Sequence, residues 1–408
     1  MIRRGRRVCL GSFRVDDGEI HVEMATMRTA RANSMGMATP AKRVEGRGTL
    51  HGSVEVAHRP PMAKVEAPAV AFGVAAAVVA AAALTKRVLD TPSREYKDGA
   101  NTVGEEYNAW TDEGVLEYYW GEHIHLGHYS REEREKGAGT LLGCHVKDFK
   151  KAKLDFVDEM LRWSGAEKPR KILDVGCGIG GTTRHLAKLF PEAEVTGITL
   201  SSSQVRRATE LAGQAGLKNV RFQVMDALDM EFEPDTFDLV WACESGEHMP
   251  DKKKYVESMT RVLKPSGKIA IATWCQRETP PEYTKDEMER LEFLYKEWAH
   301  PYFISYQDYG RLLEGTGQVS NVVAEDWVEE TLPSWRHSIW VGVWDPWVVV
   351  FKGPYIWYKT IREIVTLERM HRAFANGLMT YGMIKGEKIQ SYSDAPTAEA
   401  SATGSPAV

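Results

Sequence analysis

The sequence has few cysteines, and none of them forms a CxxC pair. The five cysteines are Cys9, Cys144, Cys177, Cys243 and Cys275. This odd number without a pairing pattern argues against a zinc site or a disulfide framework, so a reducing compartment fits best. The chain also lacks an excess of basic residues, because its formal net charge is −5, and so it has no global attraction to nucleic acid.

The beginning of the chain is poor in acidic residues. Residues 1–66 contain 12 Lys and Arg against 7 Asp and Glu, whereas the rest contains 40 against 50. The segment 24–44 has no acid and is rich in Ala, Ser, Thr and Arg, a composition typical of organelle transit peptides. We therefore expect residues 1–66 to be a transit peptide-like leader.

Long, strongly apolar runs are also scarce. The stretch 67–84, APAVAFGVAAAVVAAAAL, almost reaches the length of a bilayer span, but ten of its 18 residues are alanine. Residues 67–87 therefore form a membrane anchor, a second targeting element or a helix that only touches the membrane. The small, polar residues 389–408 are expected to be disordered.

The stretch KILDVGCGIGGTTRHLAKLF has the clearest local pattern. Its apolar run 171–175 predicts a buried parallel strand, and a helix is expected from Thr182 onward. Between them, Gly176, Gly178 and Gly180 predict a turn in which the backbone approaches a ligand closely. Asp174 lies at the strand end and can order this turn. The alternative is a plain tight turn, and the glycine spacing differs from the GxGxxG of NAD-binding sheets.

The alternation of strand and helix continues along the chain. Further strands are expected at 193–200, 219–227, 237–245 and 268–274. Helices are expected at 201–217 and at 251–267, the second ended by Pro265 and Gly267. This pattern predicts an α/β fold with a doubly wound, Rossmann-like parallel sheet, which binds ligands at the carboxyl ends of its strands. The residues at those ends are 174–180, 199–204, 226–227 and 244–248.

The motifs DVGCGIGG, GITLSSSQ, VMDA and LKPSGKI resemble those of class I S-adenosylmethionine (SAM) methyltransferases. Within that superfamily, EYYWGEHIHLGHY, WAHPYFISYQDY, LPSWRHSIW and FANGLMTYGMIKG resemble the tocopherol methyltransferase type. They are most similar to the cyanobacterial-type enzymes that methylate 2-methyl-6-phytyl-1,4-benzoquinol. The resemblance covers about 104–386 and implies a SAM-binding Rossmann-like core with a helical, aromatic-rich C-terminal addition.

The resemblance also implies a set of SAM-binding residues. They are Asp174, Gly176, Gly178, Gly180, Thr199, Gln204, Asp226 and Ala227. Many class I enzymes bind the SAM ribose with an acid at the end of the second strand, but this chain has Thr199 there. Thr199 and Gln204 would then supply the polar contacts, although Gln204 could equally be an ordinary residue of the first helical turn.

Two clusters are candidates for acid–base chemistry. Glu247 and His248 follow the fourth strand, where methyl acceptors usually bind, although His248 could instead be a core or helix-cap histidine. In YYWGEHIHLGHYS, the i, i+2 spacing of His123 and His125 disfavours a metal site, and we expect none. The resemblance makes this segment a flap over SAM. His125 could act in acid–base catalysis or substrate orientation, and packing is the alternative for it and for His128.

The C-terminal part is rich in aromatic residues. Six of the twelve tryptophans lie at 327–357, close to Lys359 and Arg362. Such a composition is typical of a prenyl-tail pocket or a membrane-surface segment, and also of the Trp-rich core of a helical subdomain. We expect a helical lid at 104–165, a SAM-binding core at 166–330 and a substrate- or membrane-contact region at 331–388.

The function that these features predict is ring methylation of a prenylated benzoquinol, with a phytyl or a solanesyl tail, in tocopherol and plastoquinone synthesis. SAM is the only cofactor required. A general base that removes a quinol proton would make the ring carbon electron-rich. The alternatives are an enzyme that methylates a tocopherol or an amine, and a catalytically silent SAM-binding protein. The leader implies a plastid location, at the inner envelope or thylakoid membrane.

Overall fold

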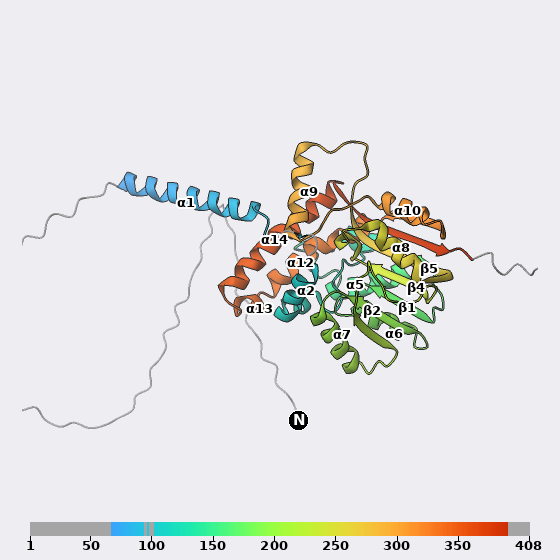
Figure 1. Ribbon diagram of the computed structural model, residues 1–408. Coiled ribbons are helices and arrows are strands. Elements are labelled where there is room, and N and C mark those ends of the chain that lie inside the picture. Colours follow the sequence, from blue (N-terminus) through green and yellow to red (C-terminus); the bar gives the residue numbers. More distant parts are fainter. Residues whose placement is uncertain (1–66, 94–95, 98–101, 391–408) are drawn as a thin grey trace, which may run out of the picture. The chain divides into compact units, whose positions relative to one another are not determined.

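The computed structural model describes residues 67–93, 96–97 and 102–390. The expected leader at 1–66, together with Cys9, and residues 391–408 of the expected tail lie outside these ranges. The described residues contain a seven-stranded sheet with the order β3-β2-β1-β4-β5-β7-β6 (Figure 1). Its strands are β1 (Lys171–Val175), β2 (Glu194–Thr199), β3 (Val220–Val224), β4 (Phe237–Cys243), β5 (Leu263–Gln276), β6 (Val319–Asp326) and β7 (Met379–Lys388).

The first five strands are parallel, which confirms the predicted doubly wound α/β sheet. β7 pairs antiparallel with β5 on one side and with β6 on the other, and neither β6 nor β7 was expected from the sequence. The predicted core at 166–330 therefore omits one strand of the sheet, because β7 comes from the region that was assigned to substrate or membrane contact.

Helices cover both faces of the sheet. They are α1 (Ala67–Asp90), α2 (Thr102–Glu113), α3 (Val115–Trp120), α4 (Arg131–Glu135), α5 (Phe149–Ser164), α6 (Gly181–Leu189), α7 (Ser202–Gln214), α8 (Lys252–Val262), α9 (Lys285–Glu297), α10 (Tyr306–Gly315), α11 (Val328–Thr331), α12 (Pro333–Trp344), α13 (Trp347–Val350) and α14 (Pro354–Ala375). Because neighbouring strand residues face opposite ways, Ile172 packs with Phe156 of α5, whereas Leu173 packs with Tyr255 of α8.

The predicted helix at 251–267 is too long. α8 ends at Val262, and Leu263 already belongs to β5. Pro265 and Gly267 therefore lie in the strand segment that follows the helix and do not end it. At the other end the prediction was sound, because Asp251 caps the helix by accepting a hydrogen bond from the Lys254 backbone N–H.

The alanine-rich segment forms the greater part of α1. Its described side chains Val79 and Leu84 are 68% and 64% exposed. Among the helices that the structure describes, none combines the length and the apolar character needed to cross a bilayer. A membrane span is one of the three alternatives given above for residues 67–87, and this finding does not support it.

Candidate active site

The glycine turn after β1 is held by β2, because the backbone N–H groups of Gly176 and Cys177 both donate to the Ile198 carbonyl. Gly176, Gly178 and Gly180 have φ angles of +83°, +54° and +77°, which side chains disfavour. A Cβ at Gly178 would meet nothing closer than the Gln204 amide nitrogen at 4.0 Å, so this glycine faces open space.

The other two glycines of the turn are required by packing. A Cβ at Gly176 would lie 2.3 Å from the Cβ of Ser245. A Cβ at Gly180 would lie 2.5 Å from the Phe222 ring. A side chain at Gly176 would therefore collide with the segment after β4.

A cavity of about 100 Å³ opens at the carboxyl ends of β1, β2 and β4. Most of the predicted cofactor residues line it, namely Asp174, Gly176, Gly178, Thr199, Gln204 and Ala227. Gly180 and Asp226 do not line it. Asp226 instead accepts a hydrogen bond from the Leu228 backbone N–H at 2.8 Å and so orders its own turn.

Two polar pairs define the chemistry of this first cavity. The Thr183 hydroxyl donates to Asp174 Oδ2 at 2.6 Å, while burial raises the pKa of Asp174 to about 7. The Thr199 hydroxyl donates to Gln204 Oε1 at 2.7 Å. Gln204 is 3% exposed, so it is more than a surface residue of the first helical turn. The walls thus offer one buried carboxyl group and one oriented amide.

The histidine segment closes over the first cavity, which 122–125 line from the side opposite the sheet. The Arg184 guanidinium pairs with Glu122 at 2.6 Å and donates to the Ile179 carbonyl, which ties the segment to the glycine turn. A Cβ at Gly181 would lie 2.1 Å from the Glu122 carbonyl oxygen, so the two backbones touch there. We refer to residues 122–126 as the flap.

The ring of His125 is held from both sides. Its Nδ1 donates to the Leu126 carbonyl at 2.7 Å, and its Nε2 lies 3.3 Å from His123 Nδ1. Burial lowers the pKa of His125 to about 3, so the ring is neutral near pH 7. His128 lines neither cavity, and its ring packs edge-on against Trp327.

A second, larger cavity of about 390 Å³ adjoins the first. Both cavities are lined by Val103, Tyr107, Ile124, Glu244 and His248. The remaining walls of the larger cavity are mainly aromatic and aliphatic, and they include Trp110, Tyr119, Trp120, Trp274, Trp298, Trp335, Ile339, Ile364 and Leu367. A small cavity that contains several polar groups therefore continues into a large, more apolar one.

Two carboxyl groups, one partly and one fully buried, lie at the junction of the cavities or next to it. Glu247 is 1% exposed, lines the apolar cavity and accepts a hydrogen bond from the Thr273 hydroxyl at 2.7 Å. Glu244, with a φ of +50°, accepts hydrogen bonds from the Leu126 N–H and the Tyr381 hydroxyl, both at 2.7 Å. Burial raises the pKa of both carboxyl groups, and the charge of Glu247 raises the pKa of Glu244 further.

His248 also lies at this junction. The Tyr107 hydroxyl is 3.0 Å from its Nε2, and the His300 ring stacks on it with centroids 4.5 Å apart. Burial, followed by the charge of Lys252, lowers the pKa of His248 to about 3. The imidazole is therefore neutral and can only donate and accept hydrogen bonds. In the described part of the chain, no group of three or more potential metal ligands comes together.

Comparisons with known proteins identify the family of this chain. A family model described as a methyltransferase domain matches residues 166–322. The 2-methyl-6-phytyl-1,4-hydroquinone methyltransferase of Synechocystis sp. is 40% identical over 293 residues, which span 70% of this chain and 87% of that protein. The chloroplastic tocopherol O-methyltransferase of Arabidopsis thaliana is 35% identical over 297 residues, or 70% of this chain and 81% of the relative. The chain belongs to the tocopherol-type family of SAM-dependent methyltransferases.

Solved structures show the same fold at lower identity. A putative sarcosine dimethylglycine methyltransferase from Galdieria sulphuraria superposes with a TM-score of 0.57 at 21% identity and covers 68% of this chain and 98% of that one. The geranyl diphosphate C-methyltransferase of Streptomyces coelicolor superposes with a TM-score of 0.54 at 17% identity, over 71% and 97% of the two chains. The methyltransferase therefore has the predicted class I fold.

SAM, the cofactor of this family, fits the first cavity. The open space in front of Gly178 lets a ligand lie against the backbone, and Asp174 offers a carboxylate to a positively charged group. The Thr199 hydroxyl and the Gln204 amide can form hydrogen bonds with hydroxyl groups of the ligand. When bound, SAM supplies an electrophilic methyl group on a sulfonium.

Several residues of the site were not predicted from the sequence. Glu244 was noted only as part of 244–248, and its left-handed backbone is visible only in the structure. His300 was noted only within the motif WAHPYFISYQDY, and Tyr107 was not singled out, because packing alone brings them to His248 from the loop after α9 and from 141 residues before it. The junction between the two cavities is thus formed by segments that are far apart in the chain.

Proposed function

We propose that this methyltransferase transfers the methyl group of SAM to a ring carbon of a prenylated benzoquinol. The observation that carries the proposal is the 390 Å³ apolar cavity that continues directly from the cofactor cavity. Its volume and lining suit a lipophilic acceptor. The name of the Synechocystis relative, which is 40% identical, supports the same substrate class.

We propose that six residues of the first cavity bind SAM. They are Asp174, Gly176, Gly178, Thr199, Gln204 and Ala227. Gly180 and Asp226, which lie outside the lining, are proposed to shape the turns on either side. The flap covers the cofactor and excludes water from the reacting groups. His125 holds the flap through its two ring nitrogens, so we now assign it a positioning role rather than a proton transfer.

Glu247 is proposed as the general base. Because its pKa is raised, the carboxylate is basic enough to take a proton from a quinol hydroxyl near neutral pH. Removing this proton pushes electron density into the ring and makes a ring carbon nucleophilic. Glu244 holds the end of the flap through the Leu126 N–H, and the charge of Glu247 raises the pKa of Glu244. His248, neutral and bonded to Tyr107, orients the acceptor.

The prenyl tail is proposed to run through the apolar cavity toward the surface at α13. Val343 and Val350 line this cavity and are also 47% and 40% exposed. Beside them, Trp347 and Phe351 are 61% and 81% exposed. We propose that this exposed aromatic surface contacts a membrane from which the acceptor enters, since tryptophan favours the bilayer interface.

Vesicle binding tests the membrane contact. The double variant Trp347→Ser and Phe351→Ser should bind liposomes of plastid lipid composition more weakly than the wild type. Leu142→Ser is the matched control, because Leu142 is 90% exposed but lines neither cavity. Equal binding of all three proteins would contradict a membrane role for the α13 surface.

A plastid location is proposed from two observations. The leader composition is that of a transit peptide. The names of relatives from Arabidopsis thaliana and Oryza sativa describe them as chloroplastic. A reporter fused to residues 1–100 should be imported into plastids and shortened there, and a reporter that stays in the cytosol would contradict the proposal.

Transfer of labelled methyl from SAM tests the function directly. The panel contains phytyl and solanesyl benzoquinols, kept reduced, together with tocopherols and amines. We expect the quinols to be methylated at ring carbon, as located by mass spectrometry of the product. Preferred transfer to a tocopherol or an amine would replace the proposed acceptor, and SAM binding without transfer to any acceptor would indicate a silent role.

A further inference from the structure

His300 is a buried imidazole whose ring nitrogens are unpaired. It is 3% exposed and lines the apolar cavity. Neither Nδ1 nor Nε2 has a hydrogen-bond partner among the residues that the structure describes. Leaving such groups unpaired costs about 1–3 kcal/mol each, so a buried polar group of this kind calls for a partner.

Unpaired polar atoms are concentrated around this cavity. Its lining residues contribute five such nitrogens, namely both of His300, Nδ1 of His248, and Nε1 of Trp274 and of Trp335. Mainly apolar walls that contain several unpaired donors and acceptors are typical of a site for a lipophilic molecule with a polar head. Such a molecule would satisfy these groups.

The orientation of His300 is fixed by its surroundings. Its ring lies between His248 at 4.5 Å and Phe303 at 5.1 Å, measured between centroids. The preceding residue, Ala299, has a φ of +53°, a left-handed conformation that a β-carbon disfavours. A strained backbone that aims a side chain into a cavity is a feature of ligand-binding sites.

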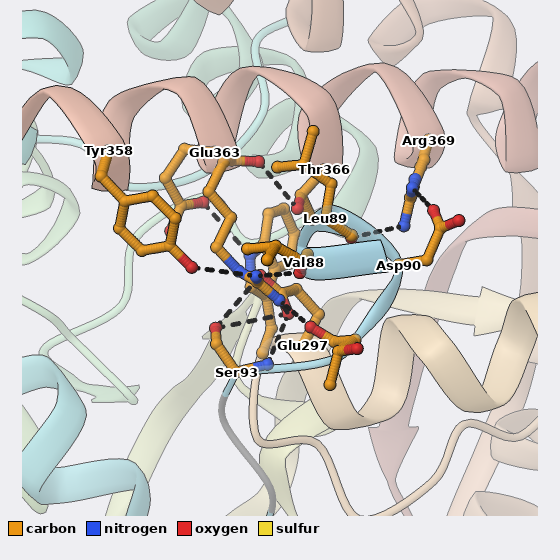
Figure 2. Close-up of polar contacts among 12 residues, drawn as sticks. Val88, Leu89, Asp90, Ser93, Glu297, Tyr358, Glu363, Thr366 and Arg369 are labelled. Atoms are coloured by element: carbon orange, nitrogen blue, oxygen red, sulfur yellow. Dashed lines mark hydrogen bonds and ion pairs between the residues drawn. The ribbon is translucent and has the colours of Figure 1, made fainter. Parts of the chain in front are cut away.

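The backbone before His300 is anchored by a buried ion pair. Glu297, at the end of α9, binds Arg362 of α14, and the two side chains are 0% and 6% exposed. The end of α1 and the residues after it join this pair, because Arg362 donates to the Val88 and Thr91 carbonyls and the Ser93 N–H donates to Glu297. Figure 2 shows Val88 and Ser93 beside Glu297. We call these five residues the anchor cluster. The cluster holds the end of α9 in place and thereby positions the loop that carries His300.

The neutral state of His300 decides which ligand group it can bind. Burial, followed by the charges of His248 and Lys252, lowers its pKa well below the usual value. A neutral imidazole has one N–H donor and one acceptor nitrogen. Either ring nitrogen can hydrogen-bond a hydroxyl group, which is both donor and acceptor, whereas only the N–H suits a carboxylate and only the bare nitrogen suits an ammonium.

We propose that His300 binds a ring hydroxyl of the methyl acceptor and selects quinols over acceptors that lack this hydroxyl. This inference deepens the proposed function and rests on it. His300 is a specificity residue in this role, and it takes no part in proton transfer.

Equilibrium binding in detergent micelles, with S-adenosylhomocysteine in the cofactor site, tests the proposal. The probes are 2-methyl-6-phytyl-1,4-benzoquinol and the two phenols that lack one or the other hydroxyl. The wild type should bind the quinol roughly 3- to 10-fold more tightly than one of the two phenols, the range expected for one neutral hydrogen bond. His300→Phe, which retains a stacking ring, should lose that preference and keep the affinity for S-adenosylhomocysteine.

Two further variants complete the test. His300→Gln keeps a donor and an acceptor and should retain the preference. His371→Phe, a partly buried histidine on α14 that does not line either cavity, should behave as the wild type. If His300→Phe is folded and prefers the quinol as strongly as the wild type and His300→Gln do, the inference is overturned.

The outcome can be separated from that of the proposed function by turnover. Quinol methylation by the wild type, together with unchanged discrimination in His300→Phe, would overturn the role of His300 alone. Quinol binding that depends on His300 without methyl transfer would overturn the function and retain the site. A wild type that binds neither quinol nor phenol would overturn both.

Discussion

Replacing Arg362 by alanine should destabilise the protein strongly. In the anchor cluster its guanidinium makes two hydrogen bonds to Glu297, with Nε donating at 2.6 Å, and it donates to the backbone carbonyls of Val88 in α1 and of Thr91 just after that helix. Figure 2 shows Glu297 beside Val88. Glu297 is fully buried, so the variant leaves its carboxylate with Ser93 as the remaining hydrogen-bond partner among the residues that the structure describes. This is an uncompensated buried charge.

Removing one partner of such a pair typically costs about 3–5 kcal/mol of unfolding free energy. For a catalytic body of this size, 1 kcal/mol corresponds to roughly 2–3 °C in the thermal midpoint, so Arg362→Ala should lower it by about 6–15 °C. Thermal unfolding followed by circular dichroism at a fixed scan rate measures this shift. Arg362→Ala should also bind quinol more weakly at temperatures below its thermal midpoint, because the His300 loop is no longer held in place.

Two controls separate the buried charge from other effects. Arg336→Ala breaks a pair with Glu368 whose side chains are 41% and 27% exposed, and it should cost about 1 kcal/mol or less. Combining Arg362→Met with Glu297→Met removes both charges and should recover much of the lost stability. An Arg362→Ala midpoint no lower than that of Arg336→Ala would refute the reasoning.

Four other changes have defined outcomes. Gly178→Val should abolish SAM binding in a folded protein, because its side chain enters the cofactor cavity, and unchanged affinity by calorimetry would contradict that assignment. Glu247→Gln should lower turnover by about 10²–10⁴-fold at unchanged SAM affinity. The wild-type rate should fall as the pH drops through the raised pKa of Glu247, where the base becomes protonated, and a variant that keeps this acidic limb would count against Glu247 as the base. His125→Ala should weaken both SAM affinity and turnover by releasing the flap, and normal values of both would leave it a packing role. Removal of 1–66 should leave methyl transfer intact, whereas removal of 1–93 should lower the thermal midpoint by deleting part of the anchor cluster, and equal midpoints would argue against that cluster.

The parallel part of the sheet could be predicted because its signals are local. β1, β4 and the second half of β5 are short, mainly apolar runs, and glycines or helix caps such as Ser201, which accepts from the Gln204 N–H, mark boundaries between the elements. β6 and β7 could not be predicted in this way. β7 contains two glycines and three charged residues, and its place is set by pairing with β5, more than 100 residues earlier in the chain.

The tryptophan-rich region shows the same limit. The sequence allowed both a packed core and a lipophilic pocket, and the structure contains both. Trp335 is fully buried and also lines the apolar cavity, whereas Trp344 and Trp347 are 59% and 61% exposed. Composition predicted the chemistry of this region, but which tryptophan faces which way depends on how α12 and α14 pack against α3 and α5.

The position of β7 has a consequence for biosynthesis. Residues 379–388 lie between β5 and β6, so β6 has no neighbour in the sheet until this segment has been synthesised. Until then, β5 presents an unpaired edge, which is a template for association with other chains. The sheet can therefore be completed only after residues 379–388 have left the ribosome, more than 100 residues after β5. Chains that stop before residue 379 should accumulate as aggregates rather than as weakly active enzyme.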